Sequence, residues 1–276
     1  MRDKGVVVVD KPSGPTSHEV ASWVAEIMGV DKAAHTGTLD PRVTGCLPVL
    51  FGTAARVSGL FAEASKAYVF VLELHAEPTR SVEEVFDEFE GEIYQRPPVQ
   101  GSARRELRVR NVERLEPLER GEGDDANRYL GRVVCGSGTY VRKLCHDIGL
   151  ALGVGGHMAE LRRTRSGCFG IEDAWYLQSL ADAVAVRGEQ PERLADAVFP
   201  LVEVLETRLP RIDAAPNTVG SVENGAPLYA PGTVSVDDDA TPDEDCFVVA
   251  DGEAVAVGTF HGHDAEPVFT PDTVLV

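Results

Sequence analysis

The sequence has few lysines and a shortage of positive charge. Its 276 residues contain 26 Lys and Arg against 45 Asp and Glu, which gives a formal net charge of −19, and only five of these cations are Lys. Such a balance by itself argues against a protein that holds nucleic acid through a general positive field, because phosphates attract basic surfaces. It is typical of a halophile-like acidic protein, since solvated carboxylates keep a chain in solution at molar salt.

Long apolar runs and paired cysteines are also absent. No stretch of 18 apolar residues occurs, and the run from Val6 to Val9 is too short for a signal peptide. The five cysteines are scattered without a CxxC pair. We therefore expect reduced, mostly buried thiols in a cytoplasmic protein, with neither a zinc site nor a disulfide framework.

The charge that is present is divided unevenly along the chain. Residues 207–276 contain 13 Asp and Glu, but their only Lys or Arg residues are Arg208 and Arg211. This segment is rich in glycine and in short β-branched runs, with an Asp251-Gly252 pair typical of a hairpin turn. We therefore expect two domains, a larger one over residues 1–206 and a small all-β barrel over residues 207–276.

Hydrophobic periodicity predicts the elements of the larger domain. Strands are expected where β-branched and aromatic residues form short runs, and helices where apolar residues recur at helical spacing. The predicted strands are 5–9, 66–74 and 129–135, and the predicted helices are 19–28 (with Ser17 as a cap), 52–64, 82–89, 140–152, 177–186 and 191–199.

A polar turn points most directly to chemistry. It contains His35, Gly37 and Asp40 between two apolar regions, and glycine lets the backbone approach a ligand closely. Asp40 followed by Pro41 is also an ordinary helix start, with the aspartate as N-cap. The turn alone therefore leaves two interpretations open, a helix cap and a reactive carboxylate.

Seven short stretches stand out along the chain. They are 10–20 (DKPSGPTSHEV), 35–41 (HTGTLDP), 95–98 (QRPP), 107–110 (LRVR), 138–142 (GTYVR), 153–158 (GVGGHM) and 160–167 (ELRRTRSG). In these stretches, and in their order, the chain resembles the TruB-type RNA pseudouridine synthases, especially the archaeal and eukaryotic dyskerin branch. Residues 207–276, with Leu209-Pro210 and the stretch 224–228 (NGAPL), resemble the PUA domain of that branch.

The resemblance implies an α+β fold and a reaction. It implies a catalytic domain with a mixed, largely antiparallel sheet and flanking helices, then a small PUA-like barrel. It also implies that uridine in tRNA or rRNA is isomerised to pseudouridine with no cofactor and no metal. By the same resemblance, Asp40 is the catalytic aspartate, Arg142 its basic partner and Tyr68 the ring that stacks on the target base. Leu161 packs at the pocket, and His35 enters the space that the flipped nucleotide leaves.

These residue types suit that chemistry. A carboxylate can act as a covalent nucleophile or as a general base, and a neighbouring Arg keeps it ionised. A flat aromatic ring can hold a uracil by stacking. Further residues are expected to contact RNA, and they are all basic: Lys11 (which also braces the active-site turn), Arg104, Arg105, Arg108, Arg162, Arg163 and Arg165.

The resemblance also implies partners, namely an H/ACA guide RNA and small H/ACA partner proteins. It leaves open a guide-independent action on the tRNA T-loop uridine. Two other functions stay open. A catalytically silent RNA-binding scaffold would need the arginines but not Asp40. A hydrolytic nucleosidase would use Asp40 and release free uracil, but the sequence identifies no second carboxylate placed to activate water.

Overall fold

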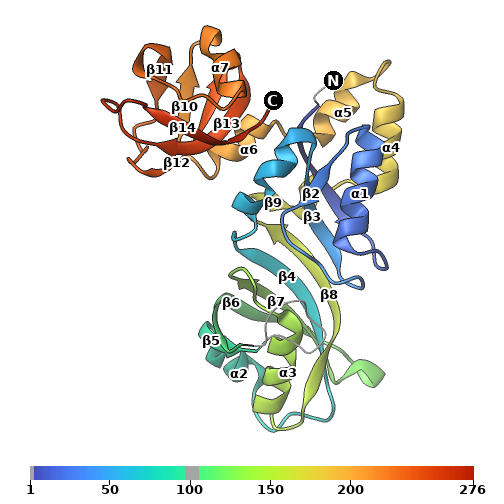
Figure 1. Ribbon diagram of the computed structural model, residues 1–276. Helices are drawn as coiled ribbons and strands as arrows, with labels where there is room; N and C mark the ends of the chain where they lie inside the picture. Colours follow the sequence, from blue (N-terminus) through green and yellow to red (C-terminus); the bar gives the residue numbers. More distant parts are fainter. Residues whose placement is uncertain (1–2, 97–105) are drawn as a thin grey trace.

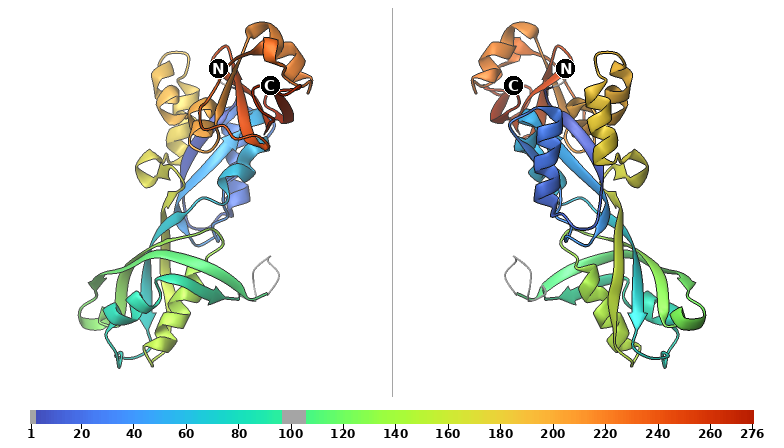
Figure 2. Two further views of the ribbon diagram at one scale, coloured as in Figure 1. Left: turned by 90° about the vertical axis from the view of Figure 1, so that its left-hand side faces the viewer. Right: turned by 90° about the vertical axis from the view of Figure 1, so that its right-hand side faces the viewer.

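Two β-sheets organise the chain (Figure 1). The computed structural model describes residues 3–96 and 106–276, and the statements below concern these residues. The larger sheet contains β1 to β9 and the smaller one β10 to β14. Figures 1 and 2 show the smaller sheet at one end of an elongated molecule and β5, β6, α2 and α3 at the other end.

The larger sheet is mixed but largely antiparallel. Its strands are β1 (Gly5–Lys11), β2 (Ala33–His35), β3 (Thr44–Phe51), β4 (Lys66–Leu74), β5 (Gly91–Gln95), β6 (Arg108–Arg120), β7 (Arg128–Cys135), β8 (Gly156–Ser166) and β9 (Phe169–Gly170). The main path runs β1-β3-β8-β4-β7-β6-β5, and only the β3–β8 pair is parallel. This confirms the predicted sheet type.

Helices cover this sheet at both ends. They are α1 (Ser17–Met28), α2 (Val82–Glu88), α3 (Val141–Ala151), α4 (Leu177–Ala185), α5 (Pro191–Ala197) and α6 (Leu201–Glu206). The apolar faces of α1 and α4 pack on β1 and β3 in one core, and those of α2 and α3 pack on β4, β6 and β7 in another. The predicted helix over residues 52–64 is the 3-10 helix η1 (Gly52–Phe61).

Two further differences from the sequence predictions bear on the site. Helix α1 takes Thr16 as its N-cap, with Glu19 completing a capping box, and Ser17 is not the cap. The hydroxyl of Ser17 is used elsewhere, because it binds the backbone of Leu39. In addition, residues 156–166 form the central strand β8, where the arginines obscure the apolar alternation that marks a strand.

The smaller sheet carries a helix of its own. Its strands are β10 (Arg211–Ala214), β11 (Thr233–Val236), β12 (Glu244–Ala250), β13 (Glu253–Phe260) and β14 (Phe269–Val274), in the order β11-β10-β12-β13-β14. The expected hairpin is present, since Asp251 and Gly252 both have positive φ between β12 and β13. The segment differs from an all-β barrel because α7 (Val219–Glu223) joins its core and because no pairing among the described residues joins β11 to β14.

A shared apolar core fixes the smaller sheet to the larger one. Val6 and Val8 of β1 pack in one cluster with Phe247 of β12 and Val257 of β13. The Lys4 ammonium adds two hydrogen bonds to backbone carbonyls near the C-terminus, at 2.7 and 2.9 Å. The two sheets therefore form one continuous body.

The cysteines carry free, mostly buried thiols. All five cysteines are free, and only Cys168 is exposed, which confirms the expectation of mostly buried thiols. Burial raises the pKa of Cys46 to about 12, so this thiol stays protonated.

None of the described helices is long and apolar enough to cross a membrane. Within residues 3–96 and 106–276, no three His, Cys, Asp or Glu side chains gather as a metal-binding group.

Candidate active site

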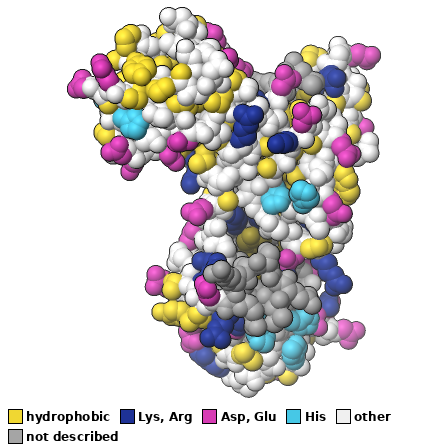
Figure 3. All heavy atoms as spheres, viewed as in Figure 1, with side chains coloured by type: hydrophobic (Ala, Val, Ile, Leu, Met, Phe, Trp, Pro, Cys, Tyr) yellow, Lys and Arg dark blue, Asp and Glu magenta, His cyan; other side chains and the backbone are white. Residues whose placement is uncertain are grey.

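A cavity of about 750 Å³ collects the predicted site residues. Its walls come from segments far apart in the chain, namely the loop between β2 and β3, strand β4, the loop before α3 and strand β8. These walls include all four predicted catalytic residues and the predicted flipping residue: Asp40, Tyr68, Arg142, Leu161 and His35. Figure 3 shows the narrow waist of the molecule, with Lys and Arg side chains above and below it.

Asp40 and Arg142 form an ion pair between Oδ2 and Nη2. Arg142 lies in the first turn of α3, so this helix delivers the guanidinium to the aspartate. The side chains are 52% and 45% exposed, and the pair therefore faces the open cavity and not the core. No helix follows the aspartate, because its carbonyl accepts a bond from Val43 N–H (2.9 Å) in a tight turn before β3. The helix-cap interpretation is wrong.

Lys11 braces this turn from inside the protein. Its ammonium donates to the carbonyls of Pro12, Pro41 and Val43, each at 2.9 Å, and the side chain is fully buried. Burial lowers the pKa of Lys11. The structure thus gives Lys11 the bracing position that was expected. The predicted contact with RNA is wrong, because no part of this side chain reaches the surface.

Ser17 fixes the other side of the same turn. Its hydroxyl accepts a hydrogen bond from Leu39 N–H (2.8 Å) and donates to the Leu39 carbonyl (3.1 Å). Ser17 is 1% exposed. Since Leu39 immediately precedes Asp40, the backbone of the aspartate is held from both directions, and its side chain has a defined starting direction.

Tyr68 and Leu161 come from neighbouring strands. Strands β4 and β8 run antiparallel, with Tyr68 opposite Arg163 and Phe70 opposite Leu161. Burial raises the pKa of Tyr68, while the charge of Arg163 acts in the opposite direction. The phenol is therefore neutral near pH 7, as a ring that stacks on a base should be.

Arg163 has a different position from the one predicted. The residue is 1% exposed, its Nε donates to the Cys46 carbonyl (2.7 Å) and its Nη2 donates to the Gly37 carbonyl (3.2 Å). It therefore links the active-site turn to β3. Arg163 also lines the cavity from within, but at 1% exposure it lies below the surface, so the prediction that it contacts phosphates at the surface is wrong.

The other predicted RNA contacts divide into three groups. Arg162 binds Asp10 with two parallel hydrogen bonds (3.0 and 2.8 Å), its side chain is 42% exposed, and its contact with phosphate stays a prediction. Arg104 and Arg105 lie outside the described residues. Arg108, in β6, does not line the cavity, and Arg165 lines a smaller cavity beside it.

Two residues that sequence reasoning missed also support the site. Gln95 is 2% exposed and pairs with the backbone of Tyr140, accepting from its N–H (2.9 Å) and donating to its carbonyl (3.2 Å). Tyr140 is the N-cap of α3, two residues before Arg142. The stretch 95–98 contributed to the family resemblance, and a buried glutamine beside it is the signal that could have identified this role.

Lys66 is the second missed residue. It lines the cavity at the start of β4, it is 5% exposed, and its ammonium donates to the carbonyls of Ala62 and Ala64. Burial lowers the pKa of Lys66 to about 8, and the nearby charge of Arg163 adds to this effect. A single lysine at the start of an apolar strand, two residues before Tyr68, is the signal in the sequence.

His35 faces the cavity in its neutral form. Burial lowers its pKa, and the charges of Arg163 and His18 lower it further. Its Nδ1 atom is buried and has no hydrogen-bond partner among the described residues. A neutral, partly buried imidazole at the cavity wall is suited to stack on a base.

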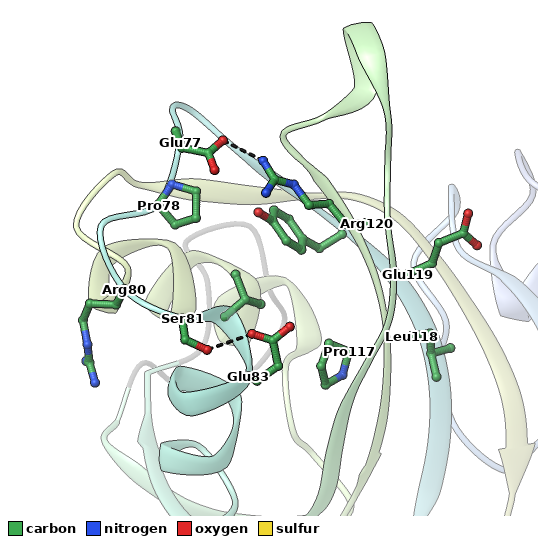
Figure 4. A pocket seen from close by; sticks show the side chains of 11 residues that line it. Glu77, Pro78, Arg80, Ser81, Glu83, Pro117, Leu118, Glu119 and Arg120 are labelled. Carbon is green, nitrogen blue, oxygen red and sulfur yellow. Dashed lines mark hydrogen bonds and ion pairs between the residues drawn. The ribbon is translucent and has the colours of Figure 1, made fainter.

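Another cavity, of about 460 Å³, lies elsewhere, near the N-terminal end of α2 (Figure 4). Figure 4 shows Arg120 directed at Glu77, and the two side chains form an ion pair at 2.6 Å. The same guanidinium lies over the ring of Tyr129, at 5.4 Å from its centre. This cavity contains none of the predicted site residues, and both of its arginines are neutralised, Arg80 by Glu88 and Arg120 by Glu77, so it is not the candidate active site.

Comparison with known proteins supports the same assignment. Residues 25–81 match the model "TruB family pseudouridylate synthase (N terminal domain)", and residues 142–206 match "tRNA pseudouridylate synthase B C-terminal domain". Two archaeal proteins, each described as a probable tRNA pseudouridine synthase B, are 46% identical to this chain. The one from Haloarcula marismortui aligns over 94% of this chain and 83% of its own length. The one from Halobacterium salinarum aligns over 99% and 94%.

Solved structures extend the match to the whole fold. A chain in the crystal structure of a Cbf5-Nop10-Gar1 complex is 38% identical with a TM-score of 0.82, covering 99% of this chain and 85% of its own. A chain in an H/ACA RNP bound to a substrate RNA containing 2′-deoxyuridine is 37% identical with a TM-score of 0.80, at 99% and 85% coverage. These matches include both sheets, which confirms the predicted fold class. The chain therefore belongs to the TruB family of pseudouridine synthases, RNA isomerases whose archaeal Cbf5 members share its fold.

Proposed function

We propose that this chain is the catalytic subunit of an H/ACA ribonucleoprotein and that Asp40 is its catalytic carboxylate. The ion pair between Asp40 and Arg142, facing the cavity that Tyr68 and Leu161 line, is the observation that carries the proposal. The assembly part is supported by similarity to chains solved in complex with Nop10, Gar1 and a substrate RNA. A guide RNA and small H/ACA proteins are the proposed partners, and guide-independent modification of tRNA is the second route.

The reaction exchanges two bonds of the target uridine. The bond from N1 to the sugar C1′ breaks, a bond from C5 to C1′ forms, and the hydrogen on C5 is replaced by one on N1. Asp40 either attacks the sugar as a nucleophile or removes a sugar proton as a base, and both roles require an ionised carboxylate. Arg142 favours that form by its charge. Bound RNA would cover the half-exposed pair and strengthen this interaction by excluding water.

The neighbouring residues have separate proposed roles. The target base must leave the RNA stack to reach Asp40, and Tyr68 would then hold it by stacking. Leu161 would close the apolar side of the pocket, and His35 would fill the vacated place in the RNA. Four arginines remain predicted contacts to phosphates, which fix position without reading sequence, namely Arg104, Arg105, Arg108 and Arg162.

We further propose a division into a catalytic domain, residues 1–206, and a PUA-like RNA-binding domain, residues 207–276. The boundary falls between the end of α6 and the start of β10. The second domain has only two cations in its sequence, so its contribution to RNA binding would depend on shape and hydrogen bonds.

The acidic composition supports an adaptation to high salt in this proposal. A net charge of −19 accompanies similarity to proteins of Haloarcula and Halobacterium. Pseudouridine formation should then persist in molar KCl, and loss of activity at molar KCl would contradict the adaptation. A cytoplasmic location stays a prediction.

Replacement of Asp40 tests the catalytic proposal. Wild type, Asp40→Asn and the control Asp31→Asn, an exposed aspartate outside the cavity, are incubated with unmodified tRNA and with a guided substrate plus partner proteins. Pseudouridine is mapped by mass spectrometry. We expect product from wild type and from the control but not from Asp40→Asn. Full activity of Asp40→Asn would refute the catalytic role of the aspartate. If wild type binds RNA but forms no product, the result favours the silent scaffold. Release of free uracil would favour the nucleosidase.

A further inference from the structure

A smaller cavity lies beside the active site. It has a volume of about 220 Å³, and its walls come from the end of η1, the turn between β8 and β9, and the residues after α6. Pockets for small-molecule ligands usually measure about 300–1,000 Å³, so this one suits a single small group. Its polar walls include Arg165, Arg208, Ser65 and Thr207.

Arg165 is held in place with donors to spare. Its Nη1 donates to the Gly167 carbonyl (3.1 Å), and its Nη2 donates to the Ser65 hydroxyl (3.3 Å). A guanidinium carries five N–H donors, so these two bonds orient the group and leave other donors for a ligand. Holding the fork in advance reduces the entropy lost when an oxyanion binds.

Arg208 supplies the second charge. It is exposed directly after α6, where its own N–H binds the Leu205 carbonyl at 2.8 Å. Among the described residues, no Asp or Glu lines this cavity, and the ion pairs formed by arginines do not include Arg165 or Arg208. The cavity of Figure 4 differs in this respect, because there Arg120 is paired with Glu77. In a chain with so many carboxylates, two unneutralised arginines at one cavity indicate an anionic ligand.

This cavity is joined to the active site by a short segment of chain. Ser65 lines the smaller cavity, and the next residue, Lys66, lines the larger one. The Ser65 carbonyl also accepts a bond from Gly167 N–H (3.0 Å), which ties this segment to the turn after β8. Arg208 is close enough to contribute, with Arg163, to the lowered pKa of Lys66. Positive charge therefore continues from the smaller cavity to the larger one.

We propose that the smaller cavity binds one phosphate of the RNA backbone near the target uridine, with Arg165 and Arg208 as its ligands. The inference rests on the proposed function, because RNA is the anion that the neighbouring cavity must admit. Two arginines and two hydroxyl side chains in the walls of one cavity match the oxygens of a phosphodiester. Such a contact sets the position of the strand relative to Asp40 and carries no sequence information.

The salt dependence of RNA binding tests this site. Dissociation constants of an unmodified tRNA transcript are measured over a range of KCl concentrations for wild type, Arg208→Ala, Arg208→Lys and Arg193→Ala. Arg193, in α5, is exposed and lines neither cavity, so it is a control for charge loss. We expect the slope of log Kd against log [KCl] to fall by about 0.7–0.9 in Arg208→Ala, as for one lost phosphate contact, and to stay unchanged in Arg193→Ala. Arg208→Lys should retain most of the slope.

The turnover of bound RNA tests whether this site positions the strand. At saturating RNA, Arg193→Ala should make pseudouridine at the wild-type rate, whereas Arg208→Ala should be slower, because the lost phosphate contact no longer sets the position of the strand relative to Asp40. Equal slope changes in Arg208→Ala and Arg193→Ala, or no change in either, would overturn the proposed phosphate site. Failure of the proposed function would look different, since wild type itself would then yield no pseudouridine while the comparison of slopes could still be made.

Discussion

Replacement of Gln95 tests how the fold brings Arg142 to Asp40. The Gln95 amide satisfies both backbone groups of Tyr140, and its side chain is almost fully enclosed. Gln95→Ala leaves the N–H of Tyr140 without its partner, whereas the Tyr140 carbonyl keeps the bonds from Lys143 N–H and Leu144 N–H (3.0 Å each). An unsatisfied buried group costs about 1–3 kcal/mol, so we expect a loss of about 1–3 kcal/mol in the free energy of unfolding.

The same change should slow the reaction. Tyr140 caps α3, so a shift of its backbone moves Arg142 away from the aspartate. A displacement near 1 Å can lower a rate by about 10²-fold, and we expect a decrease of about 10- to 100-fold in single-turnover pseudouridine formation. Gln95→Glu should give an intermediate effect, since a carboxylate still accepts from the N–H but cannot donate to the carbonyl.

Urea denaturation followed by circular dichroism measures the first quantity, and single-turnover assays measure the second. The matched control is Gln178→Ala, because the Gln178 amide binds the exposed Asp182 side chain and should change stability by less than about 0.5 kcal/mol. If Gln95→Ala is as stable and as active as this control, the proposed support of α3 by Gln95 is wrong.

Three further predictions concern the site and its supports. Arg142→Met should change the unfolding free energy by less than about 1 kcal/mol, because the ion pair with Asp40 is half exposed, yet it should abolish most pseudouridine formation. A large loss of stability together with the loss of activity would indicate a structural role for Arg142. Ser17→Ala should lower the unfolding free energy by about 1–3 kcal/mol by leaving Leu39 unpaired, measured by urea denaturation, and an unchanged midpoint would contradict this. Burial lowers the pKa of Lys66 to about 8. Between pH 8 and about 10.5 the unfolded chain still binds the proton that the folded chain has lost. The unfolding free energy of wild type minus that of Lys66→Met should therefore rise over this pH range. The full rise is about 3 kcal/mol, and a flat or falling difference would refute the burial of a charged lysine.

Consecutive arginines usually lie in solvent, so the sequence alone predicts surface positions for Arg162 and Arg163. Their partners, Asp10 and the Cys46 carbonyl, are more than 100 residues away and become neighbours only through the β3–β8 pairing. The N-cap of α1 is Thr16 and not Ser17 for a similar reason, since the Ser17 hydroxyl binds Leu39 across the fold.

The sequence by itself determined the local elements and the identity of the chemistry. Apolar periodicity is a local property, and it located β1, β4, β7, α1 and α3 to within about two residues. The ordered motifs identified the family and named Asp40, Tyr68 and Arg142. Tertiary structure alone decided which charges are enclosed, which are paired and which stay free for a ligand. Burial and ion pairing depend on the distances between distant segments. For that reason Lys11 and Arg163 became internal braces, while Arg165 and Arg208 were left together at an open cavity.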